Sequence, residues 1–323
     1  MKIKICTTDN FSSKEWNSYQ NSFNTVFETN RDLEYFKHKY KKSIEGFSYH
    51  ALLLDDNLDV VGACSVIPMM YNKNKHIIKI GQAVDVFILK SFRKDPLTLS
   101  KMYSDLKDLL IANSIIAVMA VPNSIAFPYW INIVKWKYLG DLKYWIIPIK
   151  LGSIMNKSNF YNLISSICIK FSLVINNVFS LIHNKVERKS TYELIDDEKF
   201  IDYRFSKGYE KINLKNITFY FRIYDEDNVK TAYLLDAKQK NRLSYRALVI
   251  AASYIVKNTN SDLILYVGPV KLPQLMFFKV PEKYQPKKLP LTCDILDKSN
   301  IDLYSDMLKL DNWNFGLKNY DVR

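Results

Sequence analysis

The chain has 323 residues, of which 48% are hydrophobic and 24% are charged, as in a folded protein rather than a disordered one. This length predicts two domains of ordinary size. The 8 glycines form none of the patterns GxGxxG, GxxxxGKS/T or GxSxG. A Rossmann dinucleotide site, a P-loop NTPase and a nucleophile-elbow hydrolase are therefore not expected.

The formal net charge of +13 is spread evenly, with 20 basic and 14 acidic residues in 1–150 and 26 and 19 in the remainder. An even spread indicates a generally basic surface. One interpretation is the amino-acid bias of an AT-rich genome. The other is attraction to an anionic coenzyme, nucleotide or membrane face. Nucleic acid is a weaker third, because no recognition motif accompanies the charge.

The cysteines and histidines give no metal or disulfide pattern. They are widely spaced and include no HExxH: Cys6, Cys64, Cys168, Cys293, His38, His50, His76 and His183. We therefore expect no metal and reduced thiols. The first residues, MKIKICTTDN, lack the apolar run of a secretory signal. The expected location is the cytoplasm, with peripheral membrane contact left open.

Residues 1–150 have the pattern of one α/β unit. Two apolar runs around a polar turn predict a hairpin in 47–67, and a strand follows from His76 to Leu89. A helix is expected after Pro96, and the apolar run 115–121 predicts a strand that is buried on both faces. A helix near 124–135 and a strand near 139–149 complete the unit.

The segment from Phe160 to Ile182 carries apolar residues at spacings of three and four, interrupted by Asn162, Lys170, Asn176 and Asn177. The spacing predicts a one-faced helix rather than a bilayer span. Most helices of this kind dock on their own protein. The alternative is in-plane membrane contact, for which more Lys and Arg would be usual on the polar face.

A similar order of elements recurs in the second half. We expect a hairpin from TFYFRIY and TAYLLD, a helix at 242–257, a strand at 263–267, a short helix after Pro269 and a strand near 289–296. The sequence therefore predicts two tandem α/β units, each a mixed sheet flanked by helices. The expected boundaries are 1–150, a helical linker at 151–190, and 191–323.

The segment that follows the predicted strand at 76–89 suggests an anion site. Asp85 lies in the strand, the loop FRKDP (92–96) is basic, and a helix begins directly after it. The free N–H groups and the dipole at a helix start favour a phosphate.

These residues resemble the GNAT N-acyltransferase family, in particular its long tandem-domain members found with bacterial surface-polysaccharide genes. Asp85, FRKDP, VPN (121–123) and KW (135–136) occur in the order of the family's motifs. FNTVFETNRDLEYFKHKY resembles the family's opening helix pair, and DNWNFGLKNYDVR resembles the tail that closes the second domain. The resemblance covers nearly the whole chain.

The resemblance implies a wedge between two diverging strands, in which an acyl-CoA lays its pantetheine arm along exposed backbone. Asp85 would be the general base for direct attack by an amine on the thioester, and Tyr129 would be the general acid. The expected coenzyme-binding residues are Val86, Phe87, Ile88, Arg93, Lys94, Asp95, Thr98 and Asn123. The expected substrate-binding residues are Trp313 and Asp321.

Two departures from the family pattern matter. Pro96 stands where the family has glycine, so one phosphate donor is lost. Tyr129 aligns only loosely, and Trp130 or Ile131 fits the position equally well. Structural roles stay open for all of these residues: Asp85 as a satisfied buried carboxylate, Arg93 and Lys94 as surface charges, Asn123 as a helix cap, Trp313 as core and Asp321 as solvated.

The leading prediction is an acyl-CoA-dependent N-acyltransferase, with an amino sugar or nucleotide-linked amino sugar as acceptor, in surface-polysaccharide synthesis. An aminoacyl-tRNA-dependent transferase similar to the peptidoglycan-bridge enzymes is the second prediction. The third is a catalytically inactive domain pair that binds a glycan precursor or a partner protein.

Overall fold

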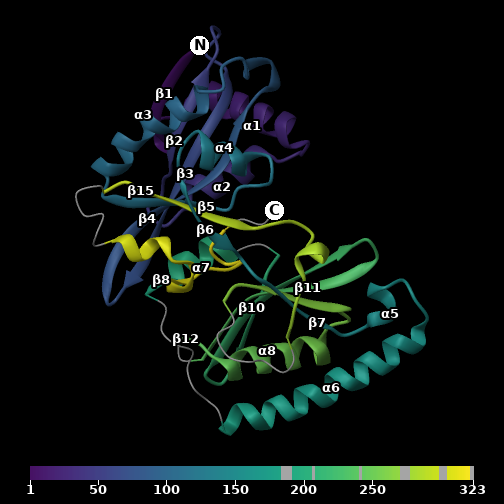
Figure 1. Ribbon diagram of the computed structural model, residues 1–323. Helices are drawn as coiled ribbons and strands as arrows, with labels where there is room; N and C mark the ends of the chain where they lie inside the picture. The colour runs from purple at the N-terminus through teal and green to yellow at the C-terminus, as the bar shows by residue number, and fades with distance from the viewer. Residues whose placement is uncertain (183–190, 206–207, 240–241, 270–276, 298–303, 321–323) are drawn as a thin grey trace. The chain divides into compact units, whose positions relative to one another are not determined.

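The computed structural model describes residues 1–182, 191–205, 208–239, 242–269, 277–297 and 304–320. The chain forms two compact units (Figure 1). Unit 1 comprises Met1–Asp141, Thr191–Arg204 and Leu289–Trp313, and unit 2 comprises Leu142–Ser190, Phe205–Lys288 and Asn314–Arg323. Each unit is therefore discontinuous in sequence, whereas the expected division into 1–150, 151–190 and 191–323 is continuous.

The sheet of unit 1 has the strand order β1-β2-β3-β4-β5-β15-β6, with β8 paired to β3. The β4–β5 pair is parallel and the other registered pairs on this path are antiparallel. The bounds are β1 Lys2–Thr7, β2 Tyr49–Leu54, β3 Val60–Lys73, β4 His76–Ile88, β5 Ile115–Ala120, β6 Lys137–Asp141, β8 Tyr192–Leu194 and β15 Pro290–Ile295.

Two helices of unit 1 begin at side-chain caps that the sequence supplies. Helix α1 (Ser13–Phe27) begins with a capping box in which Ser12 Oγ accepts the Glu15 N–H and the Glu15 carboxylate accepts the Ser12 N–H. Asp32 caps α2 (Leu33–Lys41) by accepting the Tyr35 N–H. The others are α3 (Thr98–Ala112), α4 (Ala126–Asn132) and α7 (Glu198–Phe205).

One strand of unit 1 comes from far along the chain. Strand β15, yellow in Figure 1, pairs antiparallel with both β5 and β6. Its Asp294 accepts a hydrogen bond from the Tyr103 hydroxyl on α3 at 2.9 Å and pairs with Lys107 at 2.7 Å. The strand expected near 289–296 is thus present, but it completes the sheet of the N-terminal unit.

The sheet of unit 2 has the order β14-β7-β13-β11-β10-β9, with β12 paired to β11. The β11–β13 pair is parallel and the other registered pairs are antiparallel. The bounds are β7 Tyr144–Pro148, β9 Glu210–Leu214, β10 Ile217–Glu226, β11 Val229–Gln239, β12 Arg242–Leu243, β13 Leu263–Val267 and β14 Phe278–Lys279.

The prediction of a single strand near 139–149 is wrong. The segment divides after Asp141 into β6 and β7, which belong to different sheets. Local hydrophobicity does not reveal this break, because both pieces are apolar enough to form strands.

Three α-helices of unit 2 lie within the described residues. Helix α8 (Tyr245–Asn258) follows β11 and covers its sheet, with Ser244 as N-cap. Short helix α5 (Leu151–Ile154) leads into α6 (Asn159–Ile182), which packs along α8. The segment expected to be a linker is therefore part of unit 2. The short helix expected after Pro269 lies largely outside the described residues.

The fold class predicted from sequence is confirmed: two units, each with a mixed sheet and flanking helices. Each sheet has one parallel pair whose strands are joined through a helix, β4–β5 in unit 1 and β11–β13 in unit 2. In each sheet this pair lies beside an antiparallel hairpin, β3–β4 in unit 1 and β10–β11 in unit 2. This parallel pair positions the candidate site.

Candidate functional site

Strands β4 and β5 diverge in the middle of the sheet of unit 1. Their register runs from Lys79↔Ile115 to Gln82↔Met119 and stops there. Strand β4 continues to Ile88 and stays paired with β3 on its other side, up to Gly62↔Ile88. Within the described residues, the β5-facing edge of β4 beyond Gln82 therefore lacks a registered strand partner, as expected for the predicted wedge.

Asp85 lies at an irregular point of this edge. The β3–β4 register shifts between Ala63 and Ser65, so that β4 carries a bulge there. Asp85 has φ +49°, a left-handed conformation that is uncommon outside glycine. Bulges and such backbone outliers concentrate at functional sites because they re-aim a side chain at a cost in strain.

The Asp85 carboxylate is held by two side chains of α2. Lys39 Nζ lies 2.9 Å from Oδ1, and the Tyr40 hydroxyl donates to Oδ2. The side chain of Asp85 is 11% exposed and that of Lys39 is 9% exposed, so this is a nearly buried ion pair. Each carboxylate oxygen keeps a further lone pair that is able to accept a proton.

Tyr40 is the first member of a buried polar chain. Its hydroxyl lies 2.6 Å from that of Tyr19, which lies 3.2 Å from Ser65 Oγ. Ser65 Oγ lies 2.9 Å from His50 Nδ1, and His50 Nε2 lies 2.9 Å from Thr8 Oγ1. The chain links Asp85 to the buried centre of the unit.

The carboxylate sets the direction of this chain. Because Tyr40 donates its one proton to Asp85, Tyr19 must donate to Tyr40, and Ser65 to Tyr19. His50 then donates from Nδ1 to Ser65 and accepts at Nε2. All these donors point toward Asp85, an arrangement in which hydrogen bonds reinforce one another.

Burial sets the protonation of the chain. His50 is fully buried, and desolvation lowers its pKa to about 3, so the ring is neutral at physiological pH. Burial, and then the charge of Asp85, raises the pKa of Tyr40 well above its ordinary value. Burial raises the pKa of Tyr19 as well, so Tyr19 and Tyr40 are both protonated donors and not bases.

The start of α3, the expected phosphate site, is bonded to the protein itself. The Asp95 carboxylate accepts the Leu97 N–H at 2.9 Å, and the Tyr129 hydroxyl accepts the Ser100 N–H at 3.1 Å while donating to the Pro96 carbonyl. The Thr98 N–H is bonded to the Asp95 carbonyl. Asp95 thus places a negative charge and Tyr129 an oxygen where a phosphate would bind.

The basic residues of this loop are exposed, but they differ in their contacts. Arg93 Nε donates to the Ile88 carbonyl at 2.7 Å, which attaches the loop to the end of β4. Lys94 is exposed. Asn123 Oδ1 accepts the Ala126 N–H at 2.8 Å, so Asn123 starts α4 as a cap.

The remaining predicted residues take several positions. Val86 and Ile88 are partly buried on the β4 edge, while Phe87 is buried. Trp313 is 1% exposed, stacks on Tyr192 at 4.5 Å and donates from Nε1 to the Met307 carbonyl, so its ring is enclosed by unit 1. Asp321 lies outside the described residues.

An open pocket of about 590 Å³ lies between α1 and the ends of β3 and β4. Its lining includes Lys14, Asn21, Asp59 and Phe92 but does not include Asp85. It lacks the exposed strand edge and the strained carboxylate, so the divergence of β4 and β5 remains the better candidate.

Comparison with known proteins supports this reading of the fold. No family model and no curated protein matches the sequence. Among solved structures, a GCN5-related N-acetyltransferase from Kribbella flavida matches with a TM-score of 0.57 and 7% identity, covering 92% of this chain and 72% of the other. A conserved protein of unknown function from Enterococcus faecalis, described as a probable N-acyltransferase, matches at 0.55 and 12%, covering 92% and 73%.

Saccharomyces cerevisiae N-myristoyltransferase with bound myristoyl-CoA matches at 0.53 and 11%, covering 90% of this chain and 82% of the other. The chain therefore has the fold of the GCN5-related N-acetyltransferases, as the sequence motifs predicted.

Sequence reasoning missed Lys39 and Tyr40, the partners of Asp85. They lie more than 40 residues before it, on a helix that the sequence marks only by its cap and its apolar face. Adjacent Lys and Tyr at the end of a helix carry no motif. Only the packing of α2 beside the β4 bulge gives them a role.

Proposed function

We propose that unit 1 is an acyl-CoA-dependent N-acyltransferase that transfers acetyl or another small acyl group to an amine. The observation that supports this most is the edge of β4 beyond Gln82, which begins two residues before Asp85 and has no registered partner among the described residues. A pantetheine arm carries amides that pair with a strand edge as an added strand does. The thioester would then lie beside Asp85.

In this mechanism the amine nitrogen attacks the thioester carbonyl carbon directly. The C–N bond forms, the C–S bond breaks, and the amine proton passes to the Asp85 carboxylate, directly or through a water. The coenzyme leaves as a thiolate that takes a proton from solvent. Lys39 and Tyr40 orient the carboxylate, and a general base in this position contributes roughly 10²–10⁴ in rate.

The pyrophosphate requires a change at the start of α3. Asp95 and Tyr129 already bond to its N–H groups, so the coenzyme either displaces them or is held by the side chains of Lys94 and Arg93. For the acceptor we propose an amino sugar or nucleotide-linked amino sugar of surface-polysaccharide synthesis, on the motif resemblance alone.

The test combines calorimetry with turnover. Acetyl-CoA titrated into the full chain should give a binding isotherm, and free thiol should appear when a panel of amino sugars and nucleotide-linked amino sugars is added. Asp85→Asn should bind acetyl-CoA with unchanged affinity and lose turnover. Asp105→Asn, a change at an exposed carboxylate on α3, is the matched control and should retain both.

Absence of binding heat from acetyl-CoA and longer acyl-CoAs at millimolar concentration would refute the proposal. The bonded start of α3 favours one other candidate, a transferase that takes its acyl group from aminoacyl-tRNA. Binding of tRNA with a steep dependence on salt would support that candidate, because phosphate contacts release counterions.

A further inference from the structure

Helix α6 of unit 2 turns its large apolar side chains outward. Exposure is 64% for Phe160, 67% for Phe171 and 75% for Ile182. Large exposed apolar residues run along its whole length: Phe160, Leu163, Ile164, Ile167, Phe171, Val174, Ile175, Val178, Leu181 and Ile182. These residues recur at the spacings of three and four that predicted a one-faced helix. The helix does dock on its own unit, but through its opposite face.

The docked face is narrow and mostly small or polar: Ser165, Ile169, Leu173, Asn176 and Ser180 are the buried residues of α6. Ile169 and Leu173 enter the core of unit 2, which includes α8. Asn176 accepts from the Tyr245 hydroxyl, and Asn177 Nδ2 lies 3.2 Å from Ser253 Oγ. These contacts fix the rotation of the helix.

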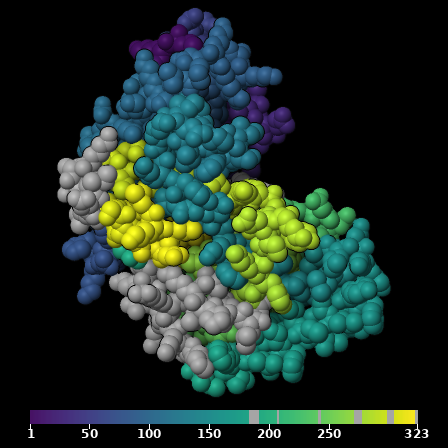
Figure 2. Space-filling model, viewed as in Figure 1, coloured from purple at the N-terminus to yellow at the C-terminus, as the bar shows by residue number. Residues whose placement is uncertain are grey.

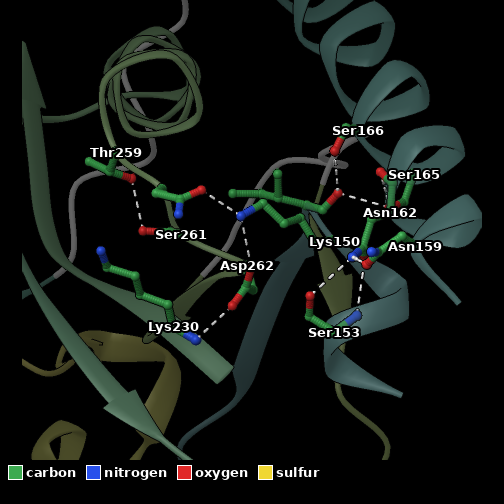
Figure 3. Close-up of polar contacts among 12 residues, drawn as sticks. Lys150, Ser153, Asn159, Asn162, Ser165, Ser166, Lys230, Thr259, Ser261 and Asp262 are labelled. Carbon is green, nitrogen blue, oxygen red and sulfur yellow. Dashed lines mark hydrogen bonds and ion pairs between the residues drawn. The ribbon is translucent and has the colours of Figure 1, made fainter. Parts of the chain in front are cut away.

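The first turns of α6 are held in the same way (Figure 3). Ser165 Oγ and Ser166 Oγ both donate to the Ile149 carbonyl, at 2.8 and 3.1 Å, and Asn162 bonds to Ser153. Lys150 in turn pairs with Asp262 at 3.1 Å. Rolling the apolar face inward would break the bonds of Asn162, Ser165 and Ser166, so the face stays outward.

The charges of the chain segment that contains α6 are of one sign. Between Asp141 and Glu187 the sequence has no acidic residue and five lysines: Lys143, Lys150, Lys157, Lys170 and Lys185. Lys143, Lys157 and Lys170 are exposed. At 3.6 residues per turn, Lys170 projects about a quarter turn from the centre of the apolar face. A lysine there can bury its stem and keep its ammonium group at a polar boundary.

We propose that α6 lies in the plane of an anionic lipid membrane and inserts this face into it. An apolar face with a lysine at its margin, in a segment that has lysines and no acidic residue, suits an interfacial helix, and acidic headgroups supply the missing negative charge. Figure 2 shows the teal atoms of residues 150–182 at an outer edge of unit 2. This inference does not depend on the chemistry proposed for unit 1.

Two other occupants fit less well. By length and composition α6 is able to cross a bilayer. Crossing would break the hydrogen bonds that Ser165 and Asn176 make to the rest of unit 2. A second copy would pair with α6 as a coiled coil does, through a narrow seam edged by complementary charges. The apolar face of α6 is wider than such a seam. The helix also carries a single charge, Lys170, and an antiparallel two-fold pair would place Lys170 near the Lys170 of the other copy, where the like charges repel.

The test is flotation of the full chain with vesicles of phosphatidylcholine alone or with phosphatidylglycerol. We expect binding to the phosphatidylglycerol vesicles that weakens with added salt. The double variant Phe171→Ser/Val178→Ser should weaken it at least tenfold, and Lys157→Glu/Lys170→Glu should abolish the preference for phosphatidylglycerol. The control Leu58→Ser/Ile77→Ser removes exposed apolar residues of unit 1 and should bind as the parent does.

Cys168 provides a second readout, because it is exposed on α6 while Cys6, Cys64 and Cys293 are buried. A polarity-sensitive fluorophore at Cys168 should shift to the blue on the anionic vesicles and be quenched by shallow but not deep lipid quenchers. Deep quenching would indicate a spanning helix instead. The proposal would be overturned if the chain did not bind vesicles and formed a dimer in light scattering. If Phe171→Ser/Val178→Ser then converted the dimer to a monomer, the face would be assigned to a second copy of the chain.

Discussion

Each sheet has an aspartate just beyond the end of its parallel pair, and the two are surrounded differently. In unit 1 the parallel pair ends at Gln82↔Met119 and Asp85 follows, and in unit 2 it ends at Leu234↔Tyr266 and Asp236 follows. Both aspartates lie beside an irregularity in the neighbouring hairpin and both pair with lysine. Because this part of the fold is shared, the two aspartates differ mainly in their surroundings.

In unit 2 the diverging edge is closed and the carboxylate is neutralised. Strand β12 pairs with the end of β11 at Lys238↔Leu243, on the side away from β10. Lys318 lies 2.8 Å and Lys238 3.7 Å from the Asp236 carboxylate, and all three side chains are below 10% exposed. Burial alone would raise the pKa of Asp236, but the two ammonium charges outweigh it and hold the pKa low.

In unit 1 the corresponding edge has no registered strand among the described residues, and Asp85 faces one lysine and a chain of neutral donors. Under the proposed function, the acid of unit 2 is a structural clamp and that of unit 1 is the general base. Substitutions at the two positions should therefore fail in different ways.

The largest expected effect is on turnover. Asp85→Asn should reduce kcat by about 10²–10⁴, while the acetyl-CoA affinity stays close to that of the parent. The asparagine keeps the size of the side chain but cannot take the amine proton. Steady-state thiol release and calorimetry on the same preparations measure both quantities. Equal activity of the two proteins would remove Asp85 from the mechanism.

At the matching position in unit 2, Asp236→Ala should cost stability. It leaves Lys318 and Lys238 buried without their carboxylate, and breaking a buried pair costs about 3–5 kcal/mol of unfolding free energy. Denaturant unfolding followed by circular dichroism measures this. The double change Asp236→Ala/Lys318→Met should recover part of the lost unfolding free energy, because it also removes one of the two buried ammonium charges. A single variant as stable as the parent would contradict the clamp.

The buried histidine predicts a pH dependence. Burial holds the pKa of His50 near 3 in the folded chain, against about 6.5 in the unfolded chain. Between these two pH values the unfolded chain binds a proton at His50 and the folded chain does not. This contribution is complete above pH 6.5 and is lost as the pH falls toward 3, at up to ~1.4 kcal/mol per pH unit. His50→Gln should show a flatter stability profile between pH 6.5 and 4 in denaturant titrations. An identical slope in both proteins would argue against a neutral buried ring.

The smallest expected effect concerns the start of α3. Asp95→Ala removes a negative charge and frees the Leu97 N–H for a phosphate, so acetyl-CoA should bind about two- to fivefold more tightly, in line with the modest energies of charges at helix ends. Asp105→Ala, on the same helix, is the control for net charge. Weaker binding by Asp95→Ala would mean that the Asp95 cap is part of the coenzyme site.

The sequence predicts what depends on local pattern. The hairpin β2–β3, the long β4 and the buried β5 follow from apolar runs and turn residues, and the start of α1 follows from Ser12 and Glu15. The position of Asp85 on a strand before a basic loop is also local information. These features need no knowledge of distant partners.

What the sequence does not reveal depends on distant contacts. The exchange of β7 and β15 between the sheets is set by pairing partners that lie far apart in the chain. The periodicity of α6 predicts a one-faced helix but does not say which face is buried, because five residues, three of them polar, suffice to dock it. The bonding of Tyr129 to the start of α3 likewise requires the packing of α4 against the loop.

The most direct test of the central claim is segment-resolved amide hydrogen exchange with and without acetyl-CoA. If the coenzyme arm adds to the open edge of β4, peptides covering residues 83–88 should become protected, while those covering 235–239 at the closed edge of unit 2 should not change. Binding of acetyl-CoA without protection at 83–88, or protection at 235–239 instead, would contradict the account.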